Sequence, residues 1–189
     1  MIEVTVKLTS LSEYSSTRFI EIPRKDNETN RDWEFRIHKE KMHYNDKKEV
    51  IIPPMAFKNC LSEAAKFLSL SVPGKGMAKF TKHFESGILI VDPLNTGVPL
   101  AQTEAKFLFL PADGKRGGGK RVMKCVPILP KWSGDLKLVV IDPAITKEVF
   151  AKHLEAAGMF IGVGFFRPSR NGYYGRFTFK AEELKWTSK

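Results

Sequence analysis

The chain has 189 residues with 31 lysines and arginines against 21 aspartates and glutamates, a formal net charge of +10. This length is typical of one domain with a real hydrophobic core, and the excess of positive charge favours a polyanionic partner. Neither a run of 18 apolar residues nor a basic-then-apolar leader is present, so we expect no membrane span, no signal peptide and a cytoplasmic protein.

The first third of the chain predicts strands. Apolar side chains alternate with polar ones over residues 2–8, the pattern of a half-buried strand. Residues 24–32 are a charged loop without an apolar residue. Alternation then resumes at Trp33, Phe35 and Ile37, ahead of further apolar residues that end at Ile52. We therefore predict a β-hairpin over residues 24–52, inserted after the first strand.

The strongest helical pattern follows at residues 54–70. Phe57, Leu61 and Ala65 belong to one continuous apolar stripe, which also contains Cys60. Proline suits the first turn of a helix, and Pro53-Pro54 stands at that place. Because Cys60 lies on the apolar stripe and has no CxxC partner, we expect it to be a reduced, buried thiol. The basic stretch 74–86 is expected to be a loop.

The second half predicts short strands, a hairpin and a second helix. Expected strands lie at 88–91, 107–110, 122–126, 136–141 and 174–180, and residues 106–126 form an inserted hairpin. A helix is expected over 146–157, with Thr146 as its N-cap and Gly158 at its end. The order of elements predicts one α+β domain over residues 1–189, with a ferredoxin-like or RRM-like antiparallel sheet carrying two helices.

Residues 162–179 contain four glycines, three arginines and two adjacent tyrosines. Glycines allow a close approach to a polyanion, guanidinium groups pair with phosphates, and tyrosine rings stack on unpaired bases. The segment therefore predicts a single-stranded nucleic-acid surface, and the same glycines also suit the turn of a β-hairpin. The candidate contacts are Arg167, Arg170, Tyr173, Tyr174 and Arg176.

A second basic segment forms the tip of the 106–126 hairpin. It contains Lys115, Arg116, Lys120, Arg121 and Lys124 around three glycines, and we expect it to bind a phosphate backbone. A solvated tip is the alternative. Residues 114–120 match the first seven positions of a phosphate-binding P-loop, but Arg121 stands where Ser or Thr should hold magnesium, and a strand follows in place of a helix. Nucleotide hydrolysis is therefore not expected.

The sequence predicts neither a metal site nor a cofactor. The four histidines stand in unrelated segments, none at ligand spacing from a cysteine or carboxylate. His153 is expected to face the core. His38 and His43, close to Lys41 and Tyr44, remain candidates for the acid–base chemistry of a metal-independent ribonuclease.

The C-terminal segment resembles the glycine-rich segment of the RAMP superfamily, the RRM-like proteins of CRISPR effector complexes. Residues 174–177 (Tyr-Gly-Arg-Phe) match the end of that segment, after a last helix and a glycine-arginine loop. Residues 52–58 are similar to the stretch before the first helix of guide-binding backbone subunits, and residues 15–18 stand where those subunits contact the guide. The resemblance implies that Arg18 and Lys58 contact RNA. Asn59 departs from the small glycine common after that lysine, and the chain is short for a backbone subunit.

This resemblance implies a non-catalytic subunit that binds single-stranded guide RNA without strong sequence preference. DNA is the other possible strand, and further subunits of a CRISPR-type complex or copies of this chain are the expected protein partners. Two alternatives remain open at this point: a viral inhibitor that mimics or caps such a subunit, and a guide-processing ribonuclease that uses His38 or His43.

Overall fold

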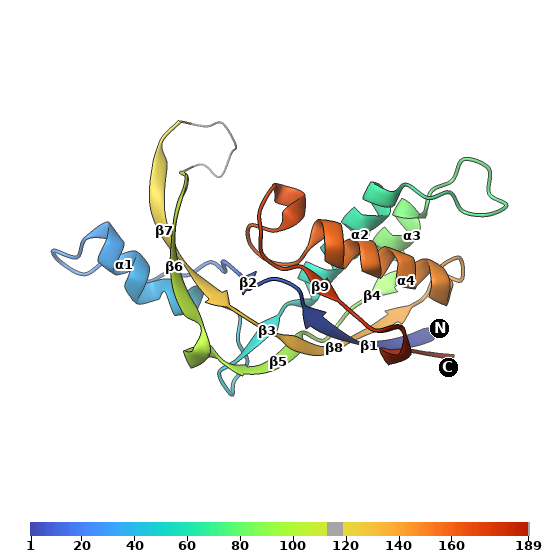
Figure 1. Ribbon diagram of the computed structural model, residues 1–189, viewed down its shortest axis with the longest axis horizontal. Coiled ribbons are helices and arrows are strands. Elements are labelled where there is room, and N and C mark those ends of the chain that lie inside the picture. Colours follow the sequence, from blue (N-terminus) through green and yellow to red (C-terminus); the bar gives the residue numbers. More distant parts are fainter. Residues whose placement is uncertain (113–118, 189) are drawn as a thin grey trace.

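The computed structural model describes residues 1–112 and 119–188, which fold around a five-stranded antiparallel sheet (Figure 1). The strand order is β10–β1–β8–β4, and β9 also pairs with β1. The strands are β1 (Ile2–Ser10), β4 (Ile88–Leu89), β8 (Ser133–Val140), β9 (Phe177–Thr178) and β10 (Leu184–Ser188). The strands predicted at 2–8 and 136–141 are confirmed, the strand predicted at 174–180 covers only two residues, and β10 was not predicted.

Three helices lie on one side of this sheet (Figure 1). They are α2 (Pro54–Leu68), α3 (Phe80–Ser86) and α4 (Lys147–Ala156), the last running into a π-helical turn, η3 (Ala157–Ile161). The Thr146 hydroxyl accepts a hydrogen bond from the Val149 amide and caps α4. Both predicted helices are confirmed, whereas the loop predicted at 74–86 is wrong over α3. No helix in the described part of the chain has the length and apolar character needed to cross a bilayer.

The main core lies between the sheet and these helices. Val4, Val6 and Leu8 of β1 are buried, and the predicted stripe of α2, including Phe57 and Leu61, is buried with them. Cys60 is a buried free thiol, and burial raises its pKa far above the usual range. His153 is fully buried and stacks on Phe84, as expected for a core histidine. This layer of helices on one antiparallel sheet is the predicted α+β class.

A second, three-stranded sheet stands away from the first (Figure 1). Its order is β2 (Tyr14–Ser15), β7 (Arg121–Leu129), β6 (Glu104–Pro111). Strands β6 and β7 pair in register from Glu104 opposite Ile128 to Pro111 opposite Arg121, which confirms the predicted 106–126 hairpin. A two-stranded sheet of β3 (Glu49–Ile52) and β5 (Leu94–Pro99) completes the β-structure, with short 3₁₀ turns at Leu100–Gln102 and Ala181–Glu183.

The hairpin predicted over 24–52 is wrong, because helix α1 (Asn30–Ile37) and a 3₁₀ turn, η1 (His38–Lys41), occupy its centre. The buried face of this unit carries Glu34, Ile37, His38 and Lys41, at helical spacing. Three of these four side chains are ionisable, so the face does not show as an apolar stripe. The alternation of Trp33, Phe35 and Ile37 therefore looked like a strand.

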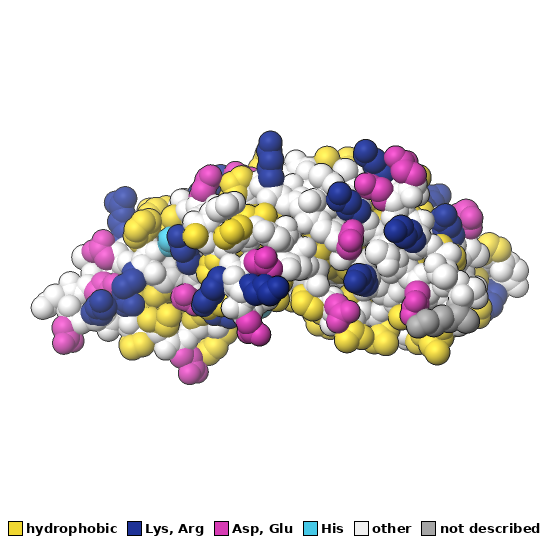
Figure 2. Space-filling view, turned by 90° about the horizontal axis from the view of Figure 1, so that it is seen from below, with side chains coloured by type: hydrophobic (Ala, Val, Ile, Leu, Met, Phe, Trp, Pro, Cys, Tyr) yellow, Lys and Arg dark blue, Asp and Glu magenta, His cyan; other side chains and the backbone are white. Residues whose placement is uncertain are grey.

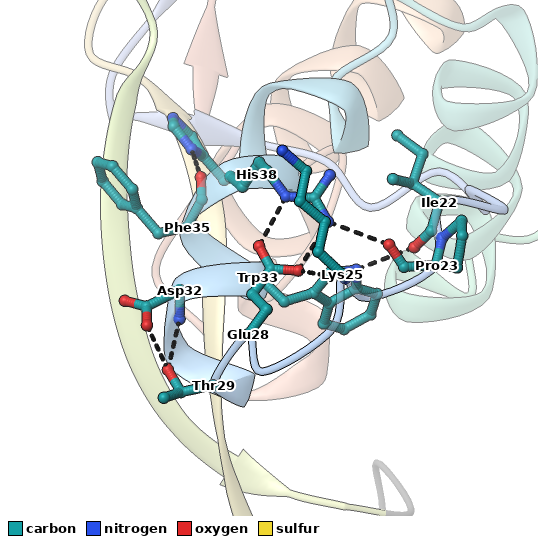
Figure 3. A network of polar contacts seen from close by, with 10 residues as sticks. Ile22, Pro23, Lys25, Glu28, Thr29, Asp32, Trp33, Phe35 and His38 are labelled. Carbon is teal, nitrogen blue, oxygen red and sulfur yellow. Dashed lines mark hydrogen bonds and ion pairs between the residues drawn. The ribbon is translucent and has the colours of Figure 1, made fainter.

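Local hydrogen bonds hold α1 to the loop before it (Figure 3). The Thr29 hydroxyl accepts from the Asp32 amide at the helix N-terminus. The Arg36 guanidinium donates to both oxygens of Glu28, at 2.7 and 2.8 Å, and to the Pro23 carbonyl. These hydrogen bonds make the charged loop part of one folded unit with the helix.

Candidate nucleic-acid interface

The glycine-arginine segment folds back on itself and is held to β2. The Phe165 amide donates to the Ser15 carbonyl, the Gly175 amide to the Glu13 carbonyl, and the Tyr174 amide to the Phe166 carbonyl. Gly164 has φ of +85°, and a Cβ at this position would lie 2.3 Å from the Ser15 carbonyl oxygen. Only glycine allows this approach. The segment is therefore a tight loop with one short 3₁₀ turn, η4 (Pro168–Arg170).

A groove of about 870 Å³ separates this loop from the β6–β7 hairpin. Six of its lining side chains are basic, and none of the described lining residues is acidic. The basic residues come from four segments that are distant in the sequence: Arg18, Lys41, Arg121, Lys124, Arg167 and Arg170. The fold thus gathers positive charge at one place. The surface seen from below is different, since basic and acidic side chains are interspersed over it (Figure 2).

Two of the groove arginines are held rigidly. Arg18 donates to the Glu40 carbonyl at 2.6 Å and to the Tyr44 hydroxyl at 3.1 Å, and it lies 4.6 Å from the centre of the Tyr44 ring. Arg167 forms an ion pair with Glu63 of α2 at 2.8 Å. These contacts fix the direction of each guanidinium group.

Two lysines share one buried carboxylate behind the groove. Glu34 of α1 is 1% exposed and accepts hydrogen bonds from Lys41, from Lys124 and from the Cys125 amide. Burial opposes ionisation of Glu34, but the hydrogen bonds from Lys41 and Cys125 outweigh it and hold the pKa of the carboxyl below its usual value. Helix α1 therefore supports the hairpin through a charged cluster.

Arg121 and Arg170 are exposed, and neither forms an ion pair with any residue in 1–112 or 119–188. They lie on opposite walls, Arg121 at the start of β7 and Arg170 in η4. Aromatic rings accompany them. Phe109 is 57% exposed, and Phe166 is 37% exposed with an unusual φ of +52°. The groove can therefore offer to the same ligand two cations that have no ion pair within the described residues, together with flat apolar rings.

The structure brings together five of the residues singled out from the sequence, namely Arg18, Arg121, Lys124, Arg167 and Arg170. Lys120 is exposed at the described end of the hairpin, where its carbonyl accepts from the Ala112 amide. Lys115 and Arg116 lie outside the described residues. Sequence reasoning did not assign Lys41, Phe109 and Phe166 to the interface. Phe166 lies within the glycine-arginine segment, whereas Lys41 and Phe109 reach the groove only through the fold.

Four other expected contacts do not line the groove. Lys58 donates to the carbonyls of Phe84 and Ile88, at 2.9 and 2.8 Å, and so ties α2 to α3 and β4. Tyr174 is 3% exposed and packs with Val126 and Ile128, so the expectation that it stacks on a base is wrong. Tyr173 is exposed but lies outside the groove lining, and the Arg176 side chain donates to the Met159 carbonyl.

The two histidines considered for catalysis also lie outside the groove lining. His38 is buried, with its Nδ1 bonded to the Phe35 carbonyl and its ring stacked on Phe35. His43 is half-buried. Burial, together with the charge of Arg18, lowers the pKa of His43 below its usual value. Its imidazole is therefore neutral at neutral pH.

Comparison with known proteins finds similarity in structure only. No protein-family model and no curated protein matches the sequence. One chain of a "CRISPR RNA-guided surveillance complex" has a TM-score of 0.35 at 10% identity, covering 82% of this chain and 57% of that one. Cmr6 from Pyrococcus furiosus has a TM-score of 0.52 at 10% identity, covering 95% of this chain and 99% of Cmr6. Over nearly the whole length of both proteins, the chain therefore has the fold of Cmr6.

Proposed function

We propose that this protein is a non-catalytic subunit of a CRISPR-type ribonucleoprotein that holds single-stranded guide RNA by its phosphate backbone. The observation that carries the proposal is the groove lining, with six cations and no acidic side chain among the described residues. Neutralising phosphates releases counterions, which favours binding of any nucleic-acid strand regardless of its sequence.

The aromatic residues favour a single strand over a duplex. Phe109 and Phe166 expose their rings among the arginines of the groove. Bases of an unpaired strand offer free faces to such rings, and each base–aromatic stack is worth ~1–3 kcal/mol. Because rings and guanidinium groups contact every base and phosphate alike, the groove suits binding without strong sequence preference.

The shared fold supports the assignment to a CRISPR-type complex. Cmr6 has the same fold over 95% of this chain, and the sequence resembles the glycine-rich segment of the RAMP superfamily in residues 174–177. The partners that follow are single-stranded RNA and other subunits of such a complex, or copies of this chain.

The test is binding of a labelled oligouridylate, measured by fluorescence anisotropy over a range of salt. The double variant Arg121→Ala/Arg170→Ala removes the two groove cations that form no ion pair with a described residue. It should bind on the order of tenfold more weakly, and the slope of log K against log salt should fall by about 1.4, since each phosphate contact on a single strand contributes about 0.7.

The matched control is Lys137→Ala/Lys152→Ala, which removes two exposed cations, one on β8 and one on α4, outside the groove lining. It has the same net charge as the groove variant and should bind RNA like the wild type. Equal losses in both double variants would mean that net charge, and not the groove, determines binding. A binding constant of the wild type that does not change with salt would reject the proposal.

Absence of catalysis is a separate part of the proposal. Purified protein, incubated with structured and unstructured RNA without added metal, should leave both intact. Cleavage that His43→Ala or His38→Ala abolishes would instead establish a ribonuclease.

A further inference from the structure

A second pocket, of about 530 Å³, lies at the junction of three segments outside the groove. One is the end of β1 with the turn after it, the second is the connection between β7 and β8, and the third is β5. The pocket shares no lining residue with the groove. Its volume falls within the ~300–1,000 Å³ of small-molecule sites.

Two serine hydroxyls and one lysine of this pocket are hydrogen-bond donors. Ser10 Oγ accepts from the Trp132 amide at 3.0 Å, and Ser12 Oγ accepts from the Arg176 amide at 2.9 Å. A hydroxyl has one proton and two lone pairs, so each serine keeps its proton for another acceptor. Lys131 is exposed and forms no ion pair with a described residue, and the lining contains no carboxylate.

The remaining wall is apolar. Leu11 is 52% exposed and forms this side of the pocket with Val98 and Pro130. Trp132 also belongs to the lining, but its ring packs in the main core. Trp132 is 3% exposed, and its indole N–H is buried without a partner among the described residues. Buried donors are rarely left unpaired. Because Trp132 belongs to the pocket lining, its indole N–H signal can be followed as a reporter of binding at this pocket.

We propose that this pocket binds one phosphorylated nucleoside, with the phosphate on Lys131, Ser10 and Ser12 and the base against the apolar wall. An ammonium and two hydroxyl donors, with no carboxylate among the described lining residues, favour an anionic oxygen group, and the apolar wall favours a flat or hydrophobic body attached to it. Free mononucleotide and one nucleotide of a longer strand share this chemistry. The site is independent of the groove and of the function proposed for it.

The experiment follows the three tryptophan indole N–H signals in ¹⁵N-labelled protein, assigned with single Trp→Phe variants. Uridine 5′-monophosphate should shift the Trp132 signal saturably and leave those of Trp33 and Trp186 in place. The variant Lys131→Ala, which removes an exposed side chain without a described ion pair, should bind about tenfold more weakly. Lys137→Ala, whose side chain lies outside the pocket lining, is the matched control and should bind normally.

The ligand series separates the sources of the nucleotide. A tetrauridylate that binds more tightly than the monophosphate supports a nucleotide of a strand, and one that binds more weakly supports a free mononucleotide. Uridine should give no shift at the same concentrations, and inorganic phosphate should bind more weakly than the nucleotide. Equal binding of uridine and its monophosphate, or of phosphate and the monophosphate, would overturn the proposal, as would the absence of any shift at millimolar concentration.

A protein carrying Arg121→Ala/Arg170→Ala keeps this test separate from the groove. That variant should still bind uridine 5′-monophosphate at the second pocket with unchanged affinity. A Trp132 shift that disappears in the groove variant would show that the nucleotide binds in the groove, and would overturn the second site.

Discussion

Glu34 holds two of the groove lysines, Lys41 and Lys124, in place. Its buried carboxylate holds Lys41 and Lys124 together and also bonds the amide of Cys125, so one side chain connects α1, η1 and β7. Removing one partner of a buried ion pair leaves the other charge uncompensated. The cations of the groove are therefore stabilised from behind by a residue that a ligand does not reach.

We expect Glu34→Gln to lower the free energy of unfolding by about 3 kcal/mol at pH 7, measured by urea denaturation. The folded-state pKa of Glu34 is lowered, so its ionised form stabilises the fold above the usual value of 4.5, and this contribution is lost as pH falls through the folded-state pKa. The difference in the free energy of unfolding between the wild type and Glu34→Gln should therefore become smaller below pH 4.5.

The exposed Glu104 provides the control. Glu104→Gln should change the free energy of unfolding by no more than about 0.5 kcal/mol at either pH. If Glu34→Gln had the same free energy of unfolding as the wild type, the charged cluster would not stabilise the fold.

At the scale of elements, the shape of the groove depends on the close approach of the glycine-arginine loop to β2. Gly164→Ala places a methyl group against the Ser15 carbonyl and also forces a positive φ on alanine. We expect a loss of about 2–4 kcal/mol in the free energy of unfolding, together with weaker RNA binding, because the loop must move away from β2.

Gly76→Ala separates the effect of the steric clash from that of the positive φ. Gly76 also has a positive φ, +57°, but a Cβ there meets no atom within 4 Å. It should lose only about 1 kcal/mol and bind RNA normally. Equal effects of the two substitutions, in chemical denaturation and in binding, would mean that backbone strain alone matters at Gly164.

The elements that sequence reasoning predicted correctly are those whose buried face is apolar. Phe57, Leu61 and Ala65 mark α2 at helical spacing, and Thr146 marks the start of α4. The unit of α1 and η1 has no such face, since its buried side includes Glu34 of α1 and Lys41 of η1, paired with each other. A capping signal was nevertheless present, because Thr29 stands three residues before Asp32.

The candidate interface was predictable only where its residues belong to a recognisable sequence pattern. Arginines in glycine-rich segments stand out in the sequence, so Arg121 and Arg170 could be found without the fold. Lys41 could not, because its place in the groove lining depends on η1 packing against β7, with the Lys41 ammonium on the Cys125 carbonyl. Tyr174 was wrongly expected to face a ligand, because its burial against Val126 and Ile128 depends on how the loop folds.

For the whole molecule, assembly distinguishes a subunit from a viral inhibitor. A backbone subunit repeats head to tail along its strand, and such a contact propagates instead of closing. We expect the sedimentation coefficient of the wild type to rise with oligouridylate length once more than one copy fits on the strand. The groove variant Arg121→Ala/Arg170→Ala should lose this dependence. If the protein sedimented as a small species whose sedimentation coefficient RNA did not change, and it bound assembled effector proteins, the result would support the inhibitor hypothesis.

Strand β1 lies at the centre of the main sheet, and its neighbours come from the far end of the chain. Ile2 is opposite Val140 on one side and Ser188 on the other. The backbone groups of β1 can therefore be paired on both sides only after β8 and β10, both distant in the sequence, have been made. Pairings so distant in sequence slow folding and leave unpaired strand edges exposed meanwhile. The groove is lined by Arg18 and also by the loop at 164–171, so it too is complete only after segments far apart in the sequence have come together.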